Sequence, residues 1–157
     1  MAKTSFDSND IRDMLMDSGL FNNFSGAELL TMGNYFKVIT LTAGDIIFKE
    51  GDLGTFMCII HIGEVEVSKE NSSQQTVEIA TLRKGRAFGE MALLDGERRS
   101  ATCTAISECC LLSLSKEGLD KMLLDTPRSA AKVIRAVAIS VSRRLRIAVG
   151  KLVDQAV

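Results

Sequence analysis

One short stretch of the chain, FGEMALLDGERRSAT at residues 88–102, combines a glycine, a carboxylate and an arginine in a pattern suited to ligand binding. A helix that begins at Gly89 would offer unpaired backbone N–H groups and positive partial charge, and glycine lets an anion approach them closely. Arg99 adds a planar guanidinium whose donors match phosphate oxygens. Glu90 would repel an anion unless the ligand also brought donors for the carboxylate. The pattern therefore favours a ligand with both an anion and a hydroxyl group, as in a phosphorylated ribose.

The same residues permit a purely structural interpretation, in which Glu90 pairs with Arg99. For an isolated glycine, glutamate and arginine, that pairing would be the simpler account. The elements that position these residues, and the segments that flank them, therefore have to be considered before the two interpretations can be weighed.

The composition is that of an ordinary globular protein. The 157 residues are 46% hydrophobic and 25% charged, which suits one domain with a substantial core over residues 1–157. Lys and Arg (19) nearly balance Asp and Glu (20), so no overall field attracts nucleic acid. We expect no direct nucleic-acid binding by this chain.

Targeting and metal-binding signals are missing from the sequence. The first ten residues, MAKTSFDSND, lack the apolar core of a signal peptide, and no later run approaches a membrane span. We therefore expect a cytoplasmic protein with no membrane partner. The cysteines have no CxxC spacing and His61 is the single histidine, so we predict reduced, partly buried thiols and no metal site. These cysteines are Cys58, Cys103, Cys109 and Cys110.

Residues 1–35 are predicted to form short helices. Ile11, Met14 and Leu15 share one face of the first helix, and Ser25 with Glu28 forms the capping box of a second. Such short helices are not stable alone in water, so they must pack on the rest of the fold.

Residues 36–114 change to short runs rich in β-branched residues, punctuated by glycines. The run EVEVSK alternates apolar and acidic residues as a half-buried strand does, and the polar loop 70–75 should join two strands in a hairpin. Strand-forming residues stop near Leu82 and resume near Ser100. We predict a mainly β fold with flanking helices (α+β), a double-stranded β-helix or jelly-roll barrel of seven or eight strands. The predicted runs are VITL, DIIF, FMCIIHIG, EVEVSK, TVEIATL, ATCTAI and CCLLSL.

Residues 115–157 return to helix. Ser115 is a candidate cap, and Thr126 with Pro127 is a cap followed by proline at the first position of a long helix. Apolar residues recur along that helix at steps of three and four, as in a coiled coil. This seam consists of Ile134, Ala138, Val141, Leu145, Ala148 and Leu152. The basic residues beside it are predicted to form a solvated face rather than a nucleic-acid contact. They are Arg143, Arg144, Arg146 and Lys151.

The stretch FGEMALLDGERRSA closely resembles the phosphate-binding cassette of the cyclic nucleotide-binding domain family, here residues 88–101. That family includes bacterial catabolite activators, regulatory subunits of cyclic-nucleotide-dependent kinases and cyclic-nucleotide-gated channels. The upstream segments LTAGDIIFKEGDLG and IIHIGEVEV resemble its first turn and its glycine-led hairpin, so the resemblance covers nearly the whole chain.

The resemblance implies definite roles for individual residues. Glu90 should accept a hydrogen bond from the ribose 2′-hydroxyl, and Arg99 should pair with the cyclic phosphate, helped by backbone N–H groups at Gly89 and around Ala92. Ser100 should contact the phosphate or the base edge. The full set of candidate ligand-binding residues is Leu82, Phe88, Gly89, Glu90, Met91, Ala92, Arg99 and Ser100.

Two departures from the family pattern bear on function. Transcription factors of the family continue into a helix-turn-helix, whereas this sequence stops at Val157, so we expect no DNA-reading segment in it. Catabolite activators place hydroxyl residues beyond an Arg-Arg-Leu on the long helix, where here Arg146, Ile147, Ala148 and Val149 follow. The base preference is therefore open between cyclic AMP, which we favour, and cyclic GMP.

The leading hypothesis is a cyclic mononucleotide sensor that passes its ligand state through the C-terminal helix to itself or to an effector protein. The alternatives are a degenerate fold that acts as an interaction protein, and the sensor part of a longer transcription regulator. An enzyme is not expected, because no nucleophile–base pair, phosphate-binding lysine loop or catalytic residue is recognisable. The long helix is predicted to join a homodimer along residues 128–152, with a lid over the nucleotide as the competing arrangement.

Overall fold

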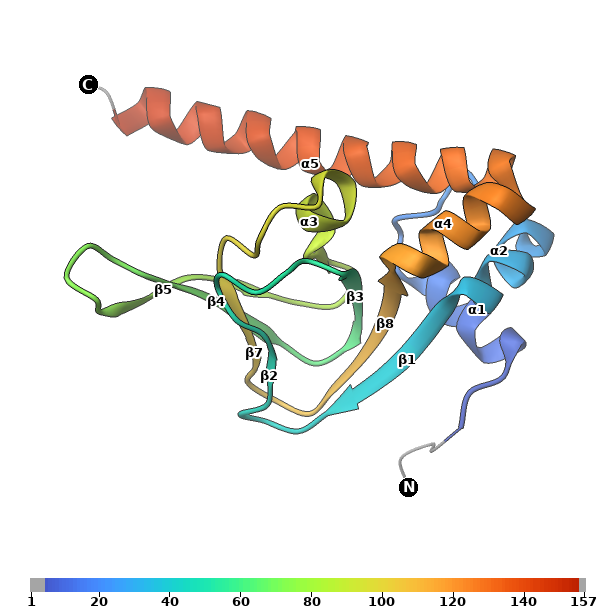
Figure 1. Cartoon of the computed structure of the whole chain (residues 1–157), viewed down its shortest axis with the longest axis horizontal. Helices are drawn as coiled ribbons and strands as arrows, with labels where there is room; N and C mark the ends of the chain where they lie inside the picture. Colours follow the sequence, from blue (N-terminus) through green and yellow to red (C-terminus); the bar gives the residue numbers. More distant parts are fainter. Residues whose placement is uncertain (1–4, 156–157) are drawn as a thin grey trace.

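The structure is a computed structural model that describes residues 5–155, so parts of the predicted segments 1–35 and 115–157 lie outside the described residues. It consists of two sheets flanked by helices, with the long α5 running across one side (Figure 1). In chain order, the elements are α1 (Ser8–Asp17), α2 (Gly26–Met32), the 3-10 helix η1 (Gly33–Tyr35), β1 (Phe36–Leu41), β2 (Ile46–Phe48), β3 (Phe56–Ile62), β4 (Val65–Glu70), β5 (Thr76–Leu82), β6 (Ala87–Phe88), α3 (Glu90–Asp95), β7 (Thr102–Ala105), β8 (Cys109–Ser115), α4 (Lys116–Asp125) and α5 (Pro127–Gln155).

The strands form two antiparallel sheets that pack face to face. We call the sheet of order β1-β8-β3-β6 the helix-side sheet and the sheet of order β2-β7-β4-β5 the cavity-side sheet. The predicted mainly β, jelly-roll-type fold with flanking helices and a C-terminal helix is confirmed as an antiparallel β-sandwich.

The apolar run in β3 follows from its burial on both faces. Met57 and Ile59 join the helices in one core cluster, while Cys58 and Ile60 face the cavity-side sheet in a second cluster. β3 is an inner strand of its sheet, between β8 and β6, and its alternate side chains lie in the two different core clusters. This arrangement fixes the layer order of helices, helix-side sheet and cavity-side sheet.

The local signals in the flanking helices and turns are mostly confirmed. The capping box of Ser25 and Glu28 is present, and Ser115 caps α4. Asn71 accepts backbone N–H groups of Ser73 and Gln75 in the hairpin between β4 and β5.

One local prediction was wrong. Strand structure does not stop at Leu82, because β6 pairs Ala87 with Ile59 and Phe88 with Cys58; two residues are too few to give an alternating pattern. The predicted start of the long helix is confirmed, since Pro127 is its first residue, and the hydroxyl of Thr126 donates to the Met122 carbonyl of α4 at 3.4 Å.

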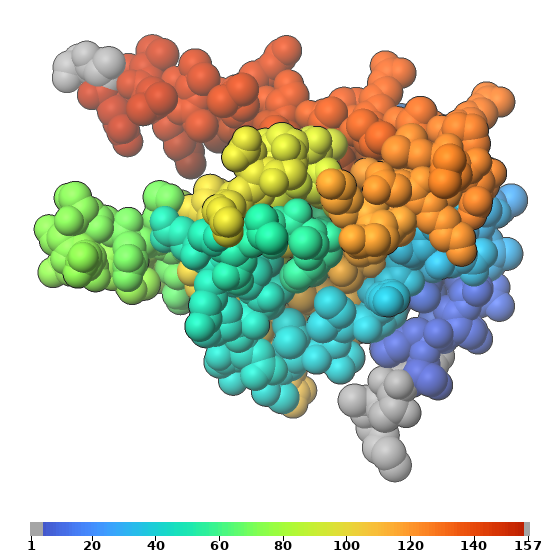
Figure 2. Space-filling view, in the orientation of Figure 1, coloured from blue at the N-terminus to red at the C-terminus, as the bar shows by residue number. Residues whose placement is uncertain are grey.

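The long α5 has two different environments. Its first half buries Ala130, Val133 and Val137 against α1, α2 and the helix-side sheet. With 29 residues, α5 is about 43 Å long, and its C-terminal end projects beyond the sandwich on the same side as the β4–β5 hairpin (Figure 2). Of the predicted seam, Ile134 packs partly on the chain's own core. Leu145 and Leu152 are exposed.

Among residues 5–155, no helix is both long enough and apolar enough to cross a membrane.

Candidate functional site

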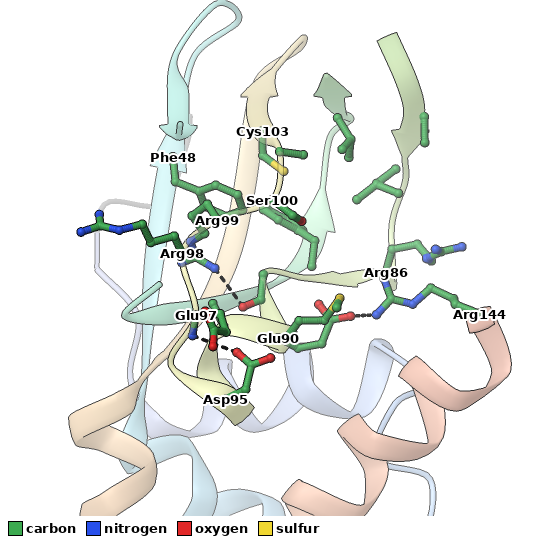
Figure 3. A pocket seen from close by; sticks show the side chains of 18 residues that line it. Phe48, Arg86, Glu90, Asp95, Glu97, Arg98, Arg99, Ser100, Cys103 and Arg144 are labelled. Atoms are coloured by element: carbon green, nitrogen blue, oxygen red, sulfur yellow. Dashed lines mark hydrogen bonds and ion pairs between the residues drawn. The ribbon is translucent and has the colours of Figure 1, made fainter. Parts of the chain in front are cut away.

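A cavity of about 450 Å³ opens between the cavity-side sheet, α3 and the middle of α5 (Figure 3). Its volume is typical of small-molecule sites. Strand residues of the cavity-side sheet form its apolar wall, and charged side chains from the α3 region and α5 form its rim. The structure brings together at this cavity all the candidate residues predicted from the sequence, namely Leu82, Phe88, Gly89, Glu90, Met91, Ala92, Arg99 and Ser100.

Gly89 is required by geometry at the start of α3. Its φ of 76° lies in the left-handed region that favours glycine. A Cβ at this position would lie 2.6 Å from Nη1 of Arg99. The Gly89 carbonyl instead accepts a hydrogen bond from that nitrogen at 2.9 Å. The glycine therefore holds the arginine as well as starting the helix.

Arg99 is buried, with 4% of its surface exposed. Its Nη2 donates to the Phe56 carbonyl, and its guanidinium carbon lies 3.8 Å from the centre of the Phe48 ring, a cation–π contact. Burial lowers the pKa of Arg99 from its ordinary value, but an arginine in this position remains charged. Its buried Nε has no hydrogen-bond partner among the described residues. One donor of a fixed cation is thus left available to a ligand.

Glu90 is almost completely buried, with 1% of its surface exposed. Its Oε1 pairs with Nη2 of Arg144, which reaches it from α5 (Figure 3). The structural interpretation, in which Glu90 pairs with Arg99, is therefore wrong, because the ion-pair partner of Glu90 is Arg144. A solvated position for Arg144 is also wrong, because α5 crosses the cavity and points this side chain inward.

Two of the candidate residues, Ala92 and Ser100, also make structural contacts. The methyl group of Ala92 packs against Gly54, and a Cβ added to Gly54 would lie only 1.9 Å from it, so residue 54 must be glycine. Met91 is mostly exposed on the rim. The carbonyl of Ser100 accepts a hydrogen bond from Nζ of Lys69 at 2.7 Å, which ties the cassette to β4.

Sequence reasoning missed several residues that line the cavity. Arg144 follows the buried face of α5 at helical spacing from Val133 and Val137, and this periodicity was the available signal. Arg86 lies in a turn and carried no sequence signal. The strand residues that complete the wall are Phe48, Val67, Ala80 and Cys103.

The cysteines near the cavity are apolar wall rather than reactive groups. Burial raises the pKa of both Cys58 and Cys103 to about 12, so neither is a thiolate near neutral pH. All four cysteines are buried and free, as predicted. In residues 5–155, no group of three or more His, Cys, Asp or Glu side chains is arranged to hold a metal ion.

A β-sandwich with a buried guanidinium and a buried carboxylate at one cavity has the features of a small-molecule-binding domain. Comparison with known families agrees with this assignment. Residues 38–126, more than half of the chain, match the cyclic nucleotide-binding domain family. The chain belongs to this family, as its cassette predicted.

The names of individual relatives include both cyclic AMP and cyclic GMP. The chain is 32% identical to the cyclic AMP receptor protein of Thermus thermophilus over 82% of this chain and 58% of that protein. It is 28% identical to a cGMP-dependent protein kinase of Drosophila melanogaster over 74% of this chain and 10% of that kinase. A solved cyclic nucleotide-binding domain from Methylobacillus flagellatus is similar with a TM-score of 0.83 and 26% identity, covering 96% of this chain and 84% of that one.

The matches cover only part of each of these two named proteins. The chain spans about a tenth of the kinase and 58% of the bacterial receptor. What is shared is a cyclic nucleotide-binding regulatory domain, which is not a catalytic fold.

Proposed function

We propose that this chain is a cyclic mononucleotide sensor whose ligand binds in the cavity between α3, α5 and the cavity-side sheet. The observation that carries the proposal is the pair of buried charges at that cavity, Arg99 with a free Nε and Glu90 at the start of α3. A cation for a phosphate and an acceptor for a hydroxyl are the two requirements of a phosphorylated ribose.

Each candidate residue has a role in this proposal. Arg99 and the N-terminal N–H groups of α3 bind the cyclic phosphate, and Glu90 accepts the ribose 2′-hydroxyl. Ser100 contacts the phosphate or the base edge. Gly89, Met91 and Ala92 let the ligand approach the backbone. Leu82 and Phe88 form the apolar wall beside the sugar and base.

Arg144 suggests how the ligand state is passed on. A ribose that bonds to Glu90 competes with the ion pair that α5 makes with the same carboxylate. Binding would therefore change the contact between α5 and α3, and the exposed end of α5 would carry that change to a second copy or to an effector protein. This route makes α5 both a lid at its middle and a signalling arm at its end.

We favour cyclic AMP over cyclic GMP, with a modest preference. The apolar residues Ile147, Ala148 and Val149 on α5 offer no side-chain hydrogen bonds to a purine. The names of the relatives include both nucleotides, in agreement with a fold that accepts either.

Calorimetric titration with cyclic AMP and cyclic GMP tests the proposal. Arg99→Ala should weaken binding by about 1–3 kcal/mol, because the phosphate loses its charge-assisted partner. Glu90→Ala should lose less affinity than Arg99→Ala. It should also no longer discriminate against the 2′-deoxy ligand. Arg83→Ala, an exposed arginine that pairs with Glu64 away from the cavity, is the matched control and should bind as the wild type. Wild-type protein that ignores both nucleotides at millimolar concentration would refute the proposal.

A second candidate is a degenerate domain that acts as an interaction protein. The observation that favours it is that Arg144 already satisfies Glu90 without any ligand. In that case nucleotide would not bind even when Arg144→Ala frees the carboxylate, whereas the sensor should bind more tightly after this change. The sensor part of a longer transcription regulator is a third candidate, favoured by the 58% coverage of the bacterial receptor.

The proposal also covers the oligomeric state and the cellular compartment of the protein. We propose one domain over residues 1–157, in the cytoplasm, that forms a homodimer through the exposed part of α5. The supporting observation is the apolar surface there, which includes Leu145 and Leu152.

A further inference from the structure

A second hollow, with a volume of about 460 Å³, adjoins the cavity described above and shares Arg86 and Arg144 with it. We call it the arginine groove. It runs between the loop 19–23, the turn that carries Arg86, and one face of α5. Residues from three separate parts of the chain line it: Gly19, Leu20, Asn22, Asn23, Arg86, Ala136, Ile139, Ser140, Arg143, Arg144 and Ile147.

The walls of the arginine groove are held in place by specific contacts. Nζ of Lys132 donates to the Asn23 carbonyl at 2.9 Å and to Glu28 at 2.9 Å, which fixes the loop against α5. On the other side, a Cβ on Gly85 would lie 3.1 Å from the carbonyl of Ser18, so the turn before Arg86 packs directly on the start of the loop. The groove is thus a built feature of the fold.

Two of the three guanidinium charges in the arginine groove have no acidic partner. Arg86, Arg143 and Arg144 line it together with no acidic side chain, and only Arg144 is paired, with Glu90 in the neighbouring cavity. The nearby carboxylates are already engaged, Asp17 by Lys84 and Glu28 by Lys132. Within the described residues, Arg86 and Arg143 form no ion pair.

Two of the arginines also repel one another. Arg86 and Arg144 lie close together at the boundary between the groove and the cavity (Figure 3), and the charge of Arg86 helps to lower the pKa of Arg144, after the larger effect of burial. Like charges held this close are destabilising unless anions compensate them. Glu90 compensates Arg144, which leaves the charge of Arg86 for a further anion. The side-chain amides of Asn22 and Asn23 and the hydroxyl of Ser140 add neutral donors to the same lining.

We infer that the arginine groove binds a small, multiply charged phosphate compound, separately from the cyclic nucleotide. A singly charged anion would leave one of the two unpaired guanidinium charges, Arg86 or Arg143, uncompensated, whereas two phosphoryl groups can each take a fork of donors. The size of the groove suits a small molecule. A nucleic acid fits less well, because the whole chain has a formal net charge of −1.

The position of Arg144 couples the two sites. Its guanidinium pairs with Glu90 on the cavity side and lines the groove on the other. A ligand that takes Glu90 releases Arg144 to the groove, so the two ligands should favour one another's binding. This coupling rests on the proposed function, whereas anion binding by the groove does not.

Pyrophosphate is the probe, titrated at constant ionic strength into the whole protein and followed by calorimetry and by the amide NMR signals of the loop 19–23. The expected result is saturable binding that Arg143→Gln weakens by roughly tenfold, the effect of one charge-assisted hydrogen bond. Arg143 does not line the nucleotide cavity, so this variant should bind cyclic nucleotide as the wild type does. Arg146→Gln, an exposed arginine on the same helix outside the groove, is the matched control and should change affinity by less than about twofold.

Three results would overturn the inference. The first is the absence of saturable pyrophosphate binding. The second is an equal loss in Arg143→Gln and Arg146→Gln, which would indicate general attraction to a basic helix. The third is a loss in Arg99→Ala with none in Arg143→Gln, which would place the probe in the nucleotide cavity.

A final titration in the presence of saturating cyclic AMP separates the two hypotheses. Tighter pyrophosphate binding under this condition supports the coupling through Arg144. If the protein ignores cyclic AMP, the proposed function fails, while the titrations without nucleotide still decide whether the arginine groove is an anion site.

Discussion

The two halves of α5 are similarly apolar in sequence and differ in what they contact. The first half places Ala130, Val133 and Val137 in the core beneath the N-terminal helices. The second half leaves Leu145 and Leu152 exposed at 63% and 66%. Arg144 lies at the boundary between the two and enters the ligand cavity. The surroundings of the helix therefore change along its length, from the core to the cavity to solvent.

This difference shows that an apolar repeat determines which face of a helix is apolar, but not which part of the protein covers that face. α5, about 43 Å long, projects beyond the sandwich at its C-terminal end (Figure 1), so only part of the helix packs on it. Apolar residues on the remaining part are what a second helix would cover. Changes on the two sides of Arg144 should therefore have effects of different kinds.

The largest effect is expected in the first half. Val133→Asp buries an unpaired charge among apolar neighbours and should lower the free energy of unfolding by more than about 3 kcal/mol, measured by urea denaturation. Val149→Asp in the exposed half is the matched change and should cost less than about 0.5 kcal/mol in dilute protein. Equal losses at the two positions would contradict the division of the helix.

At the boundary, Arg144→Gln should lower the free energy of unfolding of the ligand-free protein by about 1–3 kcal/mol, because buried Glu90 loses its partner. The loss is expected below that of a fully buried pair, since the Arg144 side chain keeps 33% of its surface exposed. The double variant Glu90→Gln/Arg144→Gln should recover part of the stability in a double-mutant cycle. Strict additivity would mean that the two groups do not interact in solution.

In the second half, Leu145→Glu should leave the fold intact and weaken self-association by at least about tenfold, because like charges would face each other across the proposed dimer. Sedimentation of both proteins, with and without cyclic nucleotide, measures the change. Met16→Glu, an exposed apolar residue on α1, is the control and should sediment as the wild type. If the wild type is a monomer at tens of micromolar under both conditions, the dimer proposal is wrong and α5 acts only as a lid.

The smallest effect concerns Gly150. A Cβ there meets no atom within 4 Å, so Gly150→Ala should stabilise the exposed end of α5 by up to about 1 kcal/mol, seen as slower hydrogen exchange near the C-terminus. In contrast, Gly118→Ala in α4 would bring a Cβ to 2.9 Å from the Tyr35 carbonyl and should destabilise the sandwich. A protein whose overall stability falls in Gly150→Ala would show that this end of the helix is packed in solution.

Much of the fold could be predicted because its signals are local. Glycines mark the turns, β-branched runs mark the strands, and Ser25 and Ser115 mark helix starts. The two-residue β6 could not be predicted, since its pairing with β3 arises only when the chain is folded. Thr126 has the residue type of a cap, and its hydroxyl donates a hydrogen bond to a carbonyl of the preceding helix.

The residues of the candidate site also fall into those that could be predicted from the sequence and those that could not. The residues of the cassette could be placed together because they are near in sequence and because the family resemblance fixed their order. Arg144 is far from Glu90 in sequence, and its contact depends on where α5 crosses the sandwich. Charge alone predicted a solvated arginine, and only the direction of the helix places it in the cavity.

The carbonyl that Gly89 offers to Arg99 bears on how binding is lost in divergent sequences. A side chain at residue 89 would displace the guanidinium, because the left-handed backbone and the 2.6 Å approach leave it no space. A descendant of this protein could therefore keep both its glutamate and its arginine and still fail to bind nucleotide. When such domains are sorted into active and vestigial members by sequence, the glycine should be counted as a third diagnostic position beside the two charges.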